Sequence, residues 1–594
     1  MQLTFTDWFV IVAYFVFNLL IGLYFRKRAT KSVSDFFISG RNVTWWLAGT
    51  SMVATTFAAD TPLAVTGLVV RNGIAGNWIW WSMAFSGMLT VFFYARLWRR
   101  AGVLTDVEFA EIRYSGKAAT FLRGFRALYL GLPINLIIMG WVNLAMVKIL
   151  VSILGVTKVE ALGIAIVMMI ITASISTLSG LWGVLWTDLF QFVLKMGMVI
   201  LLAYFAVDAS GGLHSLKSGL EQIERARQGS AGSVLSFFPD LNSVWMPFIT
   251  FFVYIAVNWW ASWYPGAEPG GGGYVAQRIF SAKDEKNSLL ATLWFNIAHY
   301  ALRPWPWILV ALVAMVRYQN DPAFVADPES GYVRVLIADL PAYLRGLMIA
   351  AFAAAYMSTI GTQLNWGASY LVNDVYRRFA VRVKNERHYV TIAQVITIFL
   401  MILSAVVTYF MGSIAGAWKF LIALGAGTGL VYILRWYWWR INAWSEISAM
   451  AVAFVTSTLL QYSFHFDESK PEEFAYLLLI TVAVTTSAWL IVTFLTKPEP
   501  RENLLAFYRR VHPGSALWGP IAREASDVPP GNDGMYNLVD WLCGVGMIYT
   551  FLYGTGQLIL GSTLLGCVFL CLGALLGWNI YRDLNKRGWE TLAK

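Results

Sequence analysis

The stretch YPGAEPGGGG at residues 264–273 interrupts an apolar segment that begins near Trp245, and YVAQR follows it at residues 274–278. Proline lacks the amide hydrogen that a helix needs, and glycine removes the restraint of a side chain. Inside a membrane, backbone groups freed by such a break need partners in the protein, in water or in a ligand. The stretch therefore predicts a broken membrane helix beside a binding site. The alternative is a loop that follows a completed span from Trp245 to Trp263.

The composition is that of a polytopic membrane protein. Of the 594 residues, 58% are hydrophobic and 13% are charged, and the mean hydropathy is +0.59. Soluble domains contain about 25% charged residues, so we predict an all-α protein with many membrane-spanning helices. The net charge of +10 lies largely in short loops, which indicates topology and gives no reason to expect a nucleic-acid partner. The three cysteines, Cys543, Cys567 and Cys571, fit neither a metal site nor a disulfide framework.

Apolar segments recur along the whole chain, and they predict about 14–15 transmembrane helices in a plasma membrane or bacterial inner membrane. They lie near 5–25, 43–70, 77–98, 125–152, 158–178, 183–207, 244–280, 288–316, 338–373, 389–412, 416–437, 443–463, 473–496, 537–557 and 559–581. Clusters of arginine and lysine fall in alternate loops, and the loops between them are acidic or mixed. By the positive-inside rule, the N-terminus is outside and the C-terminus is cytoplasmic.

Two apolar segments carry unusual numbers of small and hydroxyl residues. Residues 49–62 read GTSMVATTFAADTP, and residues 346–365 read GLMIAAFAAAYMSTIGTQLN. Small residues allow close helix packing, and hydroxyls can bond back to their own helix. Alternatively, hydroxyls together with carbonyls freed at a helix break supply the oxygen ligands that a hard cation prefers. Both interpretations remain open at this point.

Ionisable residues inside apolar segments are costly, so each is a functional candidate. Asp188 could instead cap its helix, Lys148 and Lys195 could extend toward the membrane surface, and Arg303 could meet a substrate carboxylate or pair within the protein. The full set is Asp60, Lys148, Asp188, Lys195, Glu268, Arg303 and Lys419. Motifs for nucleotide binding, metalloprotease, serine hydrolase or thiol redox chemistry do not occur in a usable context, so we do not expect an enzyme.

Four sequence blocks resemble the sodium:solute symporter family. They are DFFISGR at 35–41 with the following Trp45 and Trp46, GLWGVLWTD at 180–188, YVAQR at 274–278, and the run at 346–365. The resemblance implies a LeuT-type core of ten helices in two inverted repeats of five, whose first helices, 43–70 and 244–280, are discontinuous. It divides the chain into an extra N-terminal helix and cytoplasmic loop (1–42), a first repeat (43–207), an extracellular loop (208–243), a second repeat (244–437) and additional helices (438–594) with a cytoplasmic linker at 498–536.

The resemblance also implies a sodium site between the second and ninth apolar segments. Its ligands would be the carbonyls of Ala54, Phe57 and Ala355 and the hydroxyls of Ser358 and Thr359. Asp188 matches an aspartate close to that ion and on its release path. Thr362 suits a second sodium, although Gly361 stands where such a site would use a serine.

Tyr274 matches the aromatic residue that covers the substrate on the cytoplasmic side in this family. The residues that bind sugar in relatives are replaced in this chain. Trp80, Asn296, Gly271 and Gly273 stand at four of those positions, and Lys419 falls near a fifth. Aromatic walls suit stacking on a sugar or nucleoside, whereas Arg303 and Lys419 suit an organic anion. The predicted substrate-binding set is Thr56, Asp60, Trp80, Glu268, Gly271, Gly273, Tyr274, Asn296, Arg303 and Lys419.

We therefore expect a sodium-coupled symporter, with Na+ as the co-transported ion, that imports a small organic solute such as a sugar, amino acid or carboxylate by alternating access. The lipid bilayer is its other partner, and the sequence points to no obligate protein partner. Two alternatives are a proton-coupled transporter of the same fold and a membrane sensor that binds solute without transporting it.

Overall fold

The computed structural model describes residues 3–29, 31–226, 234–241, 246–262, 269–381, 385–467, 470–514, 516–528 and 533–589. Within these residues, eleven helices are long and apolar enough to cross a membrane, or up to thirteen if each of two bent helix pairs forms one span. One of these helices, Lys158–Ala209, contains a break and accounts for two predicted spans instead of one. The shorter apolar helix Phe248–Ala261 accounts for one more predicted span. The described helices therefore agree with the predicted number.

The helices of the first half of the chain are α1 (Phe5–Ala29), α2 (Val33–Ile38), α3 (Trp45–Thr56), α4 (Asp60–Asn72), α5 (Trp78–Trp81), α6 (Met83–Leu89), α7 (Ala95–Ala101), α8 (Phe109–Arg113), α9 (Gly116–Tyr129), α10 (Asn135–Leu154), α11 (Lys158–Ala209), α12 (Gly212–Ala226), α13 (Phe248–Val253), α14 (Trp259–Ala261), α15 (Gly273–Ser281) and α16 (Glu285–Asn296). Those of the second half are α17 (Pro304–Tyr318), α18 (Pro322–Ala326), α19 (Gly331–Asp339), α20 (Arg345–Ser369), α21 (Glu386–Phe410), α22 (Ile414–Gly425), α23 (Gly429–Tyr437), α24 (Ala443–Tyr462), α25 (Pro471–Leu495), α26 (Arg501–Val511), α27 (Gly519–Ala522), α28 (Gly534–Leu560) and α29 (Thr563–Arg587).

Helix α11 contains two of the predicted spans. Its 52 residues would be about 78 Å long as one straight helix, more than twice the hydrocarbon thickness of about 30 Å. The two spans separate at Gly180, whose backbone has φ 52° and ψ −151°. A Cβ atom at this position would lie 2.6 Å from the carbonyl oxygen of Phe36, so the break requires glycine for both its conformation and its close approach.

The predicted break in segment 43–70 is present. Helix α3 ends at Thr56, α4 begins at Asp60, and the two are bent by 57°. The bend lies next to several hydroxyl residues, and the helix does not continue at Phe57. The backbone carbonyls at the bend lie within the helix bundle. The bend therefore creates the kind of backbone site that the sequence predicts.

The second predicted break lies in segment 244–280, where α14 ends at Ala261 and α15 begins at Gly273. The stretch that opened the sequence argument falls partly outside the described residues, at 263–268. The carbonyl of Ala261 accepts a hydrogen bond of 2.8 Å from the amide of Gly427, which lies in a second bend of 48° between α22 and α23. A backbone group freed at one break is thus satisfied by backbone from another.

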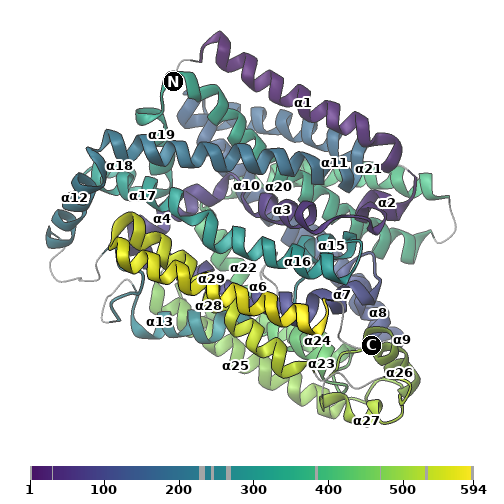
Figure 1. The fold of residues 1–594 in the computed structure, drawn as a ribbon. Helices are drawn as coiled ribbons and strands as arrows, with labels where there is room; N and C mark the ends of the chain where they lie inside the picture. The colour runs from purple at the N-terminus through teal and green to yellow at the C-terminus, as the bar shows by residue number, and fades with distance from the viewer. Residues whose placement is uncertain are drawn as a thin grey trace.

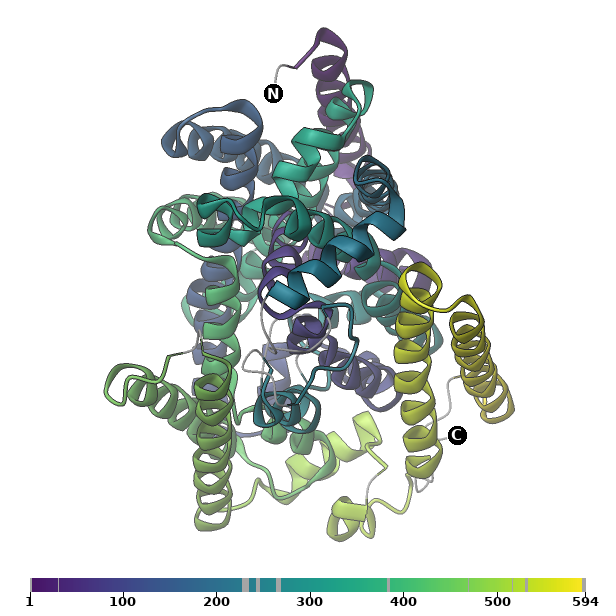
Figure 2. The same ribbon diagram turned by 90° about the vertical axis from the view of Figure 1, so that its left-hand side faces the viewer.

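Helix α3 packs against α11, α16 and α20 in the middle of the molecule (Figure 1). Two C-terminal hairpins, α24 with α25 and α28 with α29, lie on the outside of this core. The yellow α28–α29 pair lies along one side of the molecule in the turned view (Figure 2), and α28 packs against α6. The predicted linker at 498–536 contains α26, which packs against α7 and α8. The indole of Trp518 after α26 donates to the carbonyl of Trp436, so this linker is a folded part of the protein.

Candidate functional site

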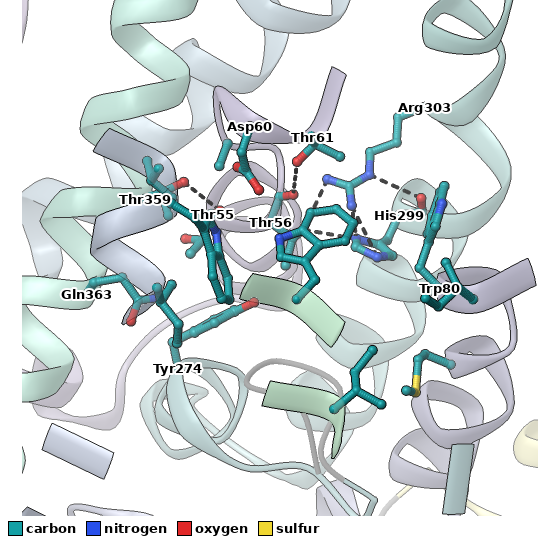
Figure 3. Close-up of a pocket in the computed structure, with 18 of the residues that line it drawn as sticks. Thr55, Thr56, Asp60, Thr61, Trp80, Tyr274, His299, Arg303, Thr359 and Gln363 are labelled. Atoms are coloured by element: carbon teal, nitrogen blue, oxygen red, sulfur yellow. Dashed lines mark hydrogen bonds between the residues drawn. The ribbon is translucent and has the colours of Figure 1, made fainter. Parts of the chain in front are cut away.

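A pocket lies beside the break between α3 and α4 (Figure 3). Five of the predicted substrate-binding residues line it, namely Thr56, Asp60, Trp80, Tyr274 and Arg303. They come from α3, α4, α5, α15 and the turn before α17, so the fold gathers them from distant parts of the sequence. Much of the remaining wall is aromatic, from Trp141, Tyr300 and Trp418.

Arg303 forms one corner of this pocket and is held there by protein groups. The helix after α16 widens into a π-helical turn at Ile297–Leu302, and Arg303 follows it directly. Its guanidinium donates to the carbonyl of His299 at 3.1 Å and to the hydroxyl of Thr56 at 3.2 Å, and it also contacts the His299 ring. Such wide turns are frequent at functional sites. The pairing of Arg303 within the protein leaves less of its donor capacity for a solute carboxylate.

Asp60 presents an open hydrogen-bond acceptor to the pocket. It is the first residue of α4 and only 3% exposed, and its Oδ1 atom has no hydrogen-bond partner among the described residues. In Figure 3 its carboxylate faces the pocket, and Tyr274 lies on the opposite side. The amino end of α4 favours a negative charge here, but a buried oxygen without a donor is costly. A solute that donates hydrogen bonds would satisfy it.

The predicted sodium ligands of α3 meet a lysine instead. The Nζ atom of Lys195 on α11 donates to the carbonyl of Ala54 at 2.8 Å and to the carbonyl of Phe57 at 3.0 Å. Lys195 is 1% exposed, so the expectation that it extends toward the membrane surface is wrong. With Lys195 in place these two carbonyls do not fit the sodium ion that the resemblance implies as a co-transported substrate, because the ammonium already uses them.

The remaining predicted ligands lie on α20, close to α3. The hydroxyl of Thr359 donates to the carbonyl of Thr55 at 2.7 Å and to that of Ala355 at 3.2 Å. The hydroxyl of Ser358 donates to Asp188 at 2.6 Å, so the predicted neighbour of the ion is also within this cluster. The structure therefore brings the predicted cation ligands together around the bend.

Thr362, predicted for a second sodium, has a cationic neighbour. Its hydroxyl accepts a hydrogen bond of 2.8 Å from Arg278 and lies 3.1 Å from the hydroxyl of Thr55. The same guanidinium is 4.0 Å from Asp188. A positive charge beside Thr362 disfavours a second sodium at that hydroxyl.

The two predicted glycines do not line the pocket. Gly271 packs against Thr90, since a Cβ atom on it would lie 2.7 Å from the Thr90 methyl carbon. The amide of Gly273 donates to Asp106 at 3.2 Å. Both have positive φ, at 79° and 58°, so glycine here serves the close path of the chain into α15. Glu268 lies outside the described residues.

Asn296 and Lys419 also lie away from this pocket. The amide of Asn296 donates to the carbonyl of Thr292 at 2.8 Å, and its side chain faces Gly87 on α6. The amine of Lys419 lies 5.5 Å from the ring of Phe474 and borders a separate pocket. The organic-anion argument that joined Lys419 to Arg303 therefore has no common site in the structure.

The sequence argument missed His299 and Gln363, which line the pocket, and it did not assign Lys195 to the cation position. His299 precedes Arg303 by four residues, a spacing that places two helical residues on one face. Lys195 follows Asp188 by seven residues, or about two helical turns, so the same rule would have placed it beside the predicted ion. Lys148 behaves differently, because it pairs with Asp327 at 3.1 Å and with Glu329 at 2.7 Å.

Comparisons with known proteins identify the family of the chain. The model of the sodium:solute symporter family matches residues 36–452. The chain is 23% identical over 514 residues to the sodium/glucose cotransporter of Vibrio parahaemolyticus, covering 81% of this chain and 90% of the relative. It is 23% identical over 487 residues to the sodium/sialic acid symporter SiaT of Proteus mirabilis (strain HI4320), covering 77% and 90%.

A solved structure supports the fold. The substrate-bound, outward-open state of a Na+-coupled sialic acid symporter matches with a TM-score of 0.67 and 21% identity, over 84% of this chain and 99% of that one. This likeness confirms the predicted all-helical LeuT-type fold.

Proposed function

We propose, from the premise that this chain belongs to the sodium:solute symporter family, that it imports a small organic solute by alternating access, driven by the inward gradient of a small cation. The family consists of membrane transporters, so the chain is an integral membrane transporter and not an enzyme. Membership and the Na+-coupled relatives support sodium as the coupling ion. The alternating basic loops support a cytoplasmic C-terminus.

The observation that carries this proposal is the pocket at the bend between α3 and α4. Discontinuous helices at the centre of a helical bundle are where secondary transporters bind substrate and coupling ion. Here the bend supplies Asp60 and Thr56 to the pocket and the carbonyls of Ala54 and Phe57 to the adjacent cation position. One bend therefore joins the pocket to the position that the Lys195 ammonium occupies. Tyr274 closes the pocket on the side of α15.

The pocket favours a solute that donates hydrogen bonds. Asp60 offers an oxygen without a described partner, and Gln363 on α20 offers another in its side-chain Oε1 atom. Trp80 and Tyr274 supply apolar surface on which a ring can stack. Arg303, the cation of this pocket, is engaged by His299 and Thr56. We therefore expect a solute with several hydroxyls or an amine, and not a simple carboxylate.

A thermal-shift screen of the purified chain tests this solute class, because a ligand that binds only the folded state raises its stability. Sugars, amino acids and simple carboxylates are compared at equal concentration. Stabilisation by a sugar or an amine, reduced in Asp60→Asn, supports the proposal. Stabilisation by carboxylates alone, undiminished in Asp60→Asn, contradicts the solute class.

Uptake into proteoliposomes tests the transport itself. Accumulation of the stabilising solute is compared under an inward sodium gradient, an inward proton gradient and no gradient. Accumulation driven by sodium or by protons identifies the coupling ion. Binding without accumulation under either gradient would favour the sensor alternative.

A further inference from the structure

We propose that Lys195 takes the place of a cation at the bend between α3 and α4, so that no sodium ion binds the carbonyls of Ala54 and Phe57. This inference rests on the proposed function only in taking the bend as a cation position. It concerns that one position, and it is compatible with transport that is coupled to a sodium ion bound at a different site.

The contacts of the Lys195 ammonium are those expected of a bound cation. Two carbonyls exposed by the end of α3 accept its hydrogen bonds, at 2.8 Å from Ala54 and 3.0 Å from Phe57. The ring of Phe57 lies 5.2 Å from the same nitrogen. An ammonium and a sodium ion carry the same charge and both seek carbonyl oxygens. The side chain therefore satisfies the carbonyl of Phe57 at the bend, and it is a second donor to the carbonyl of Ala54, which also accepts a hydrogen bond of 3.2 Å from the amide of Phe57.

The position of Lys195 is fixed by the fold. It lies in the second part of α11, after the Gly180 break, and α11 packs directly against α3. Lys195 is 1% exposed and Phe57 is 2% exposed, so water does not replace these contacts. The long side chain could reach the membrane surface, as lysines in membrane helices commonly do, but it points instead to the centre of the bundle.

The charged side chains around the bend already include more cations than carboxylates, without sodium. Asp188 is the nearby carboxylate, and it accepts hydrogen bonds from Ser51 and Ser358. The guanidinium of Arg278 lies 4.0 Å from it, and Lys195 stands two turns further along the same helix. The guanidinium of Arg303 lies 5.9 Å from the ring of Phe57, and Asp60 begins α4 just after the bend. A sodium ion at the two carbonyls would therefore be a fourth positive charge near two carboxylates, and it would touch the ammonium directly.

A tethered cation changes what the site does. A sodium ion leaves the protein when it is released, whereas Lys195 remains part of α11 and holds the bend of α3 against that helix when sodium is absent. Lys195 is thus the residue that decides whether this position accepts sodium. Shortening its side chain should open the position, because Thr359 and Ser358 still supply hydroxyls there.

Equilibrium binding of radioactive sodium to the purified full-length chain, in choline chloride and without solute, tests the proposal. The variants are Lys195→Ala, Lys195→Ser, each with and without Thr359→Ala, and Lys148→Ala as the matched control. Lys148 is also a lysine of a core helix, but it pairs with Asp327 and Glu329. We expect Lys195→Ala and Lys195→Ser to bind sodium at this position, with a half-saturating concentration at least about tenfold lower than any sodium binding by the wild type, since a like charge has been removed. Thr359→Ala should cancel this gain, and Lys148→Ala should match the wild type.

The proposal is overturned by either of two results. One is sodium binding by the wild type that Thr359→Ala weakens. The other is that neither Lys195 variant, each eluting as a folded monodisperse protein, binds sodium more tightly than the wild type. Because no solute is present, these results are independent of transport. A chain that accumulates no solute under any gradient would contradict the proposed function and leave the binding result standing.

Discussion

The amine of Lys195 lies 3.0 Å from the carbonyl oxygen of Phe57, the residue at which α3 ends. A hydrogen bond to a charged group contributes about 1.5–3 kcal/mol to stability, whereas a hydrogen bond between neutral groups contributes about 0.5–1.5 kcal/mol. The bend that forms the pocket is therefore stabilised by a side chain from a different helix. This arrangement links the geometry of the solute pocket to the position of α11.

Asp60→Asn keeps the size of the side chain and removes its charge. If Asp60 accepts hydrogen bonds from the solute, the variant should bind the solute identified by thermal shift about 10- to 150-fold more weakly, the effect of losing about 1.5–3 kcal/mol. The dissociation constant is measured by a thermal-shift titration. Asp339→Asn is the control, because Asp339 pairs with Arg317 outside the pocket. Equal affinity of Asp60→Asn and the wild type would contradict the assignment.

Tyr274 is expected to act through its ring, which lines the pocket at the start of α15. Tyr274→Ala should weaken solute binding by about tenfold or more, since a buried aromatic side chain contributes several times the energy of a methyl group. Tyr274→Phe keeps the ring and should stay within about threefold of the wild type. Titration of both variants with the same solute checks this pair. An alanine variant that binds as tightly as the phenylalanine variant would exclude a role for the ring.

Gly180→Ala should disrupt the separation of the two spans in α11. The new Cβ would lie 2.6 Å from the Phe36 carbonyl oxygen, at a φ of 52° that favours glycine. We expect a loss of about 2 kcal/mol or more, seen as a lower midpoint of thermal unfolding in detergent. Gly163→Ala, in the same helix, meets no atom within 4 Å and should stabilise the helix by up to about 1 kcal/mol. Similar midpoints for the two variants would argue against the break.

The bend at residues 57–59 was predictable, because hydroxyls, a carboxylate and a proline occur together in an otherwise apolar segment. The gathering of Thr359 and Ser358 around it was implied by the resemblance of the run at 346–365. The bend and the hydroxyl-rich run follow from local sequence, since helix breaks and hydroxyl-rich faces are set by residues close together in the chain. Of the five predicted residues that line the pocket, Trp80 and Tyr274 came from the resemblance, and Asp60 and Arg303 came from the cost of a charge in an apolar segment.

The partners of side chains from distant segments were not predictable in the same way. The amine of Lys195 can point to the membrane surface or to the core, and only the packing of α11 on α3 decides between them. Similarly, the positive φ angles of Gly271 and Gly273 could be expected, but not that the chain there would pack against Thr90 and Asp106 instead of the solute. Tertiary contacts fix these outcomes.

Glu446 should prove essential for docking α24 onto the core. Its carboxylate pairs with Arg126 at 3.0 Å and Arg435 at 3.4 Å, and all three side chains are buried. Glu446→Ala would leave two buried guanidinium groups without this partner, at a cost of about 3–5 kcal/mol. The thermal unfolding midpoint should fall well below that of Glu472→Ala, a change on the exposed surface of α25. An unchanged midpoint would show that the ion pair is not needed for stability.

Concentrative uptake tests the central claim most directly. Proteoliposomes containing the full chain are given the solute identified by thermal shift. Uptake is measured under a sodium gradient, under a proton gradient and without an ion gradient. Asp60→Asn serves as the matched variant. We predict that the internal solute concentration rises above the external one under a cation gradient, that an ionophore abolishes this excess, and that Asp60→Asn reduces it. Solute that binds the protein but never exceeds its external concentration under either gradient would contradict the account.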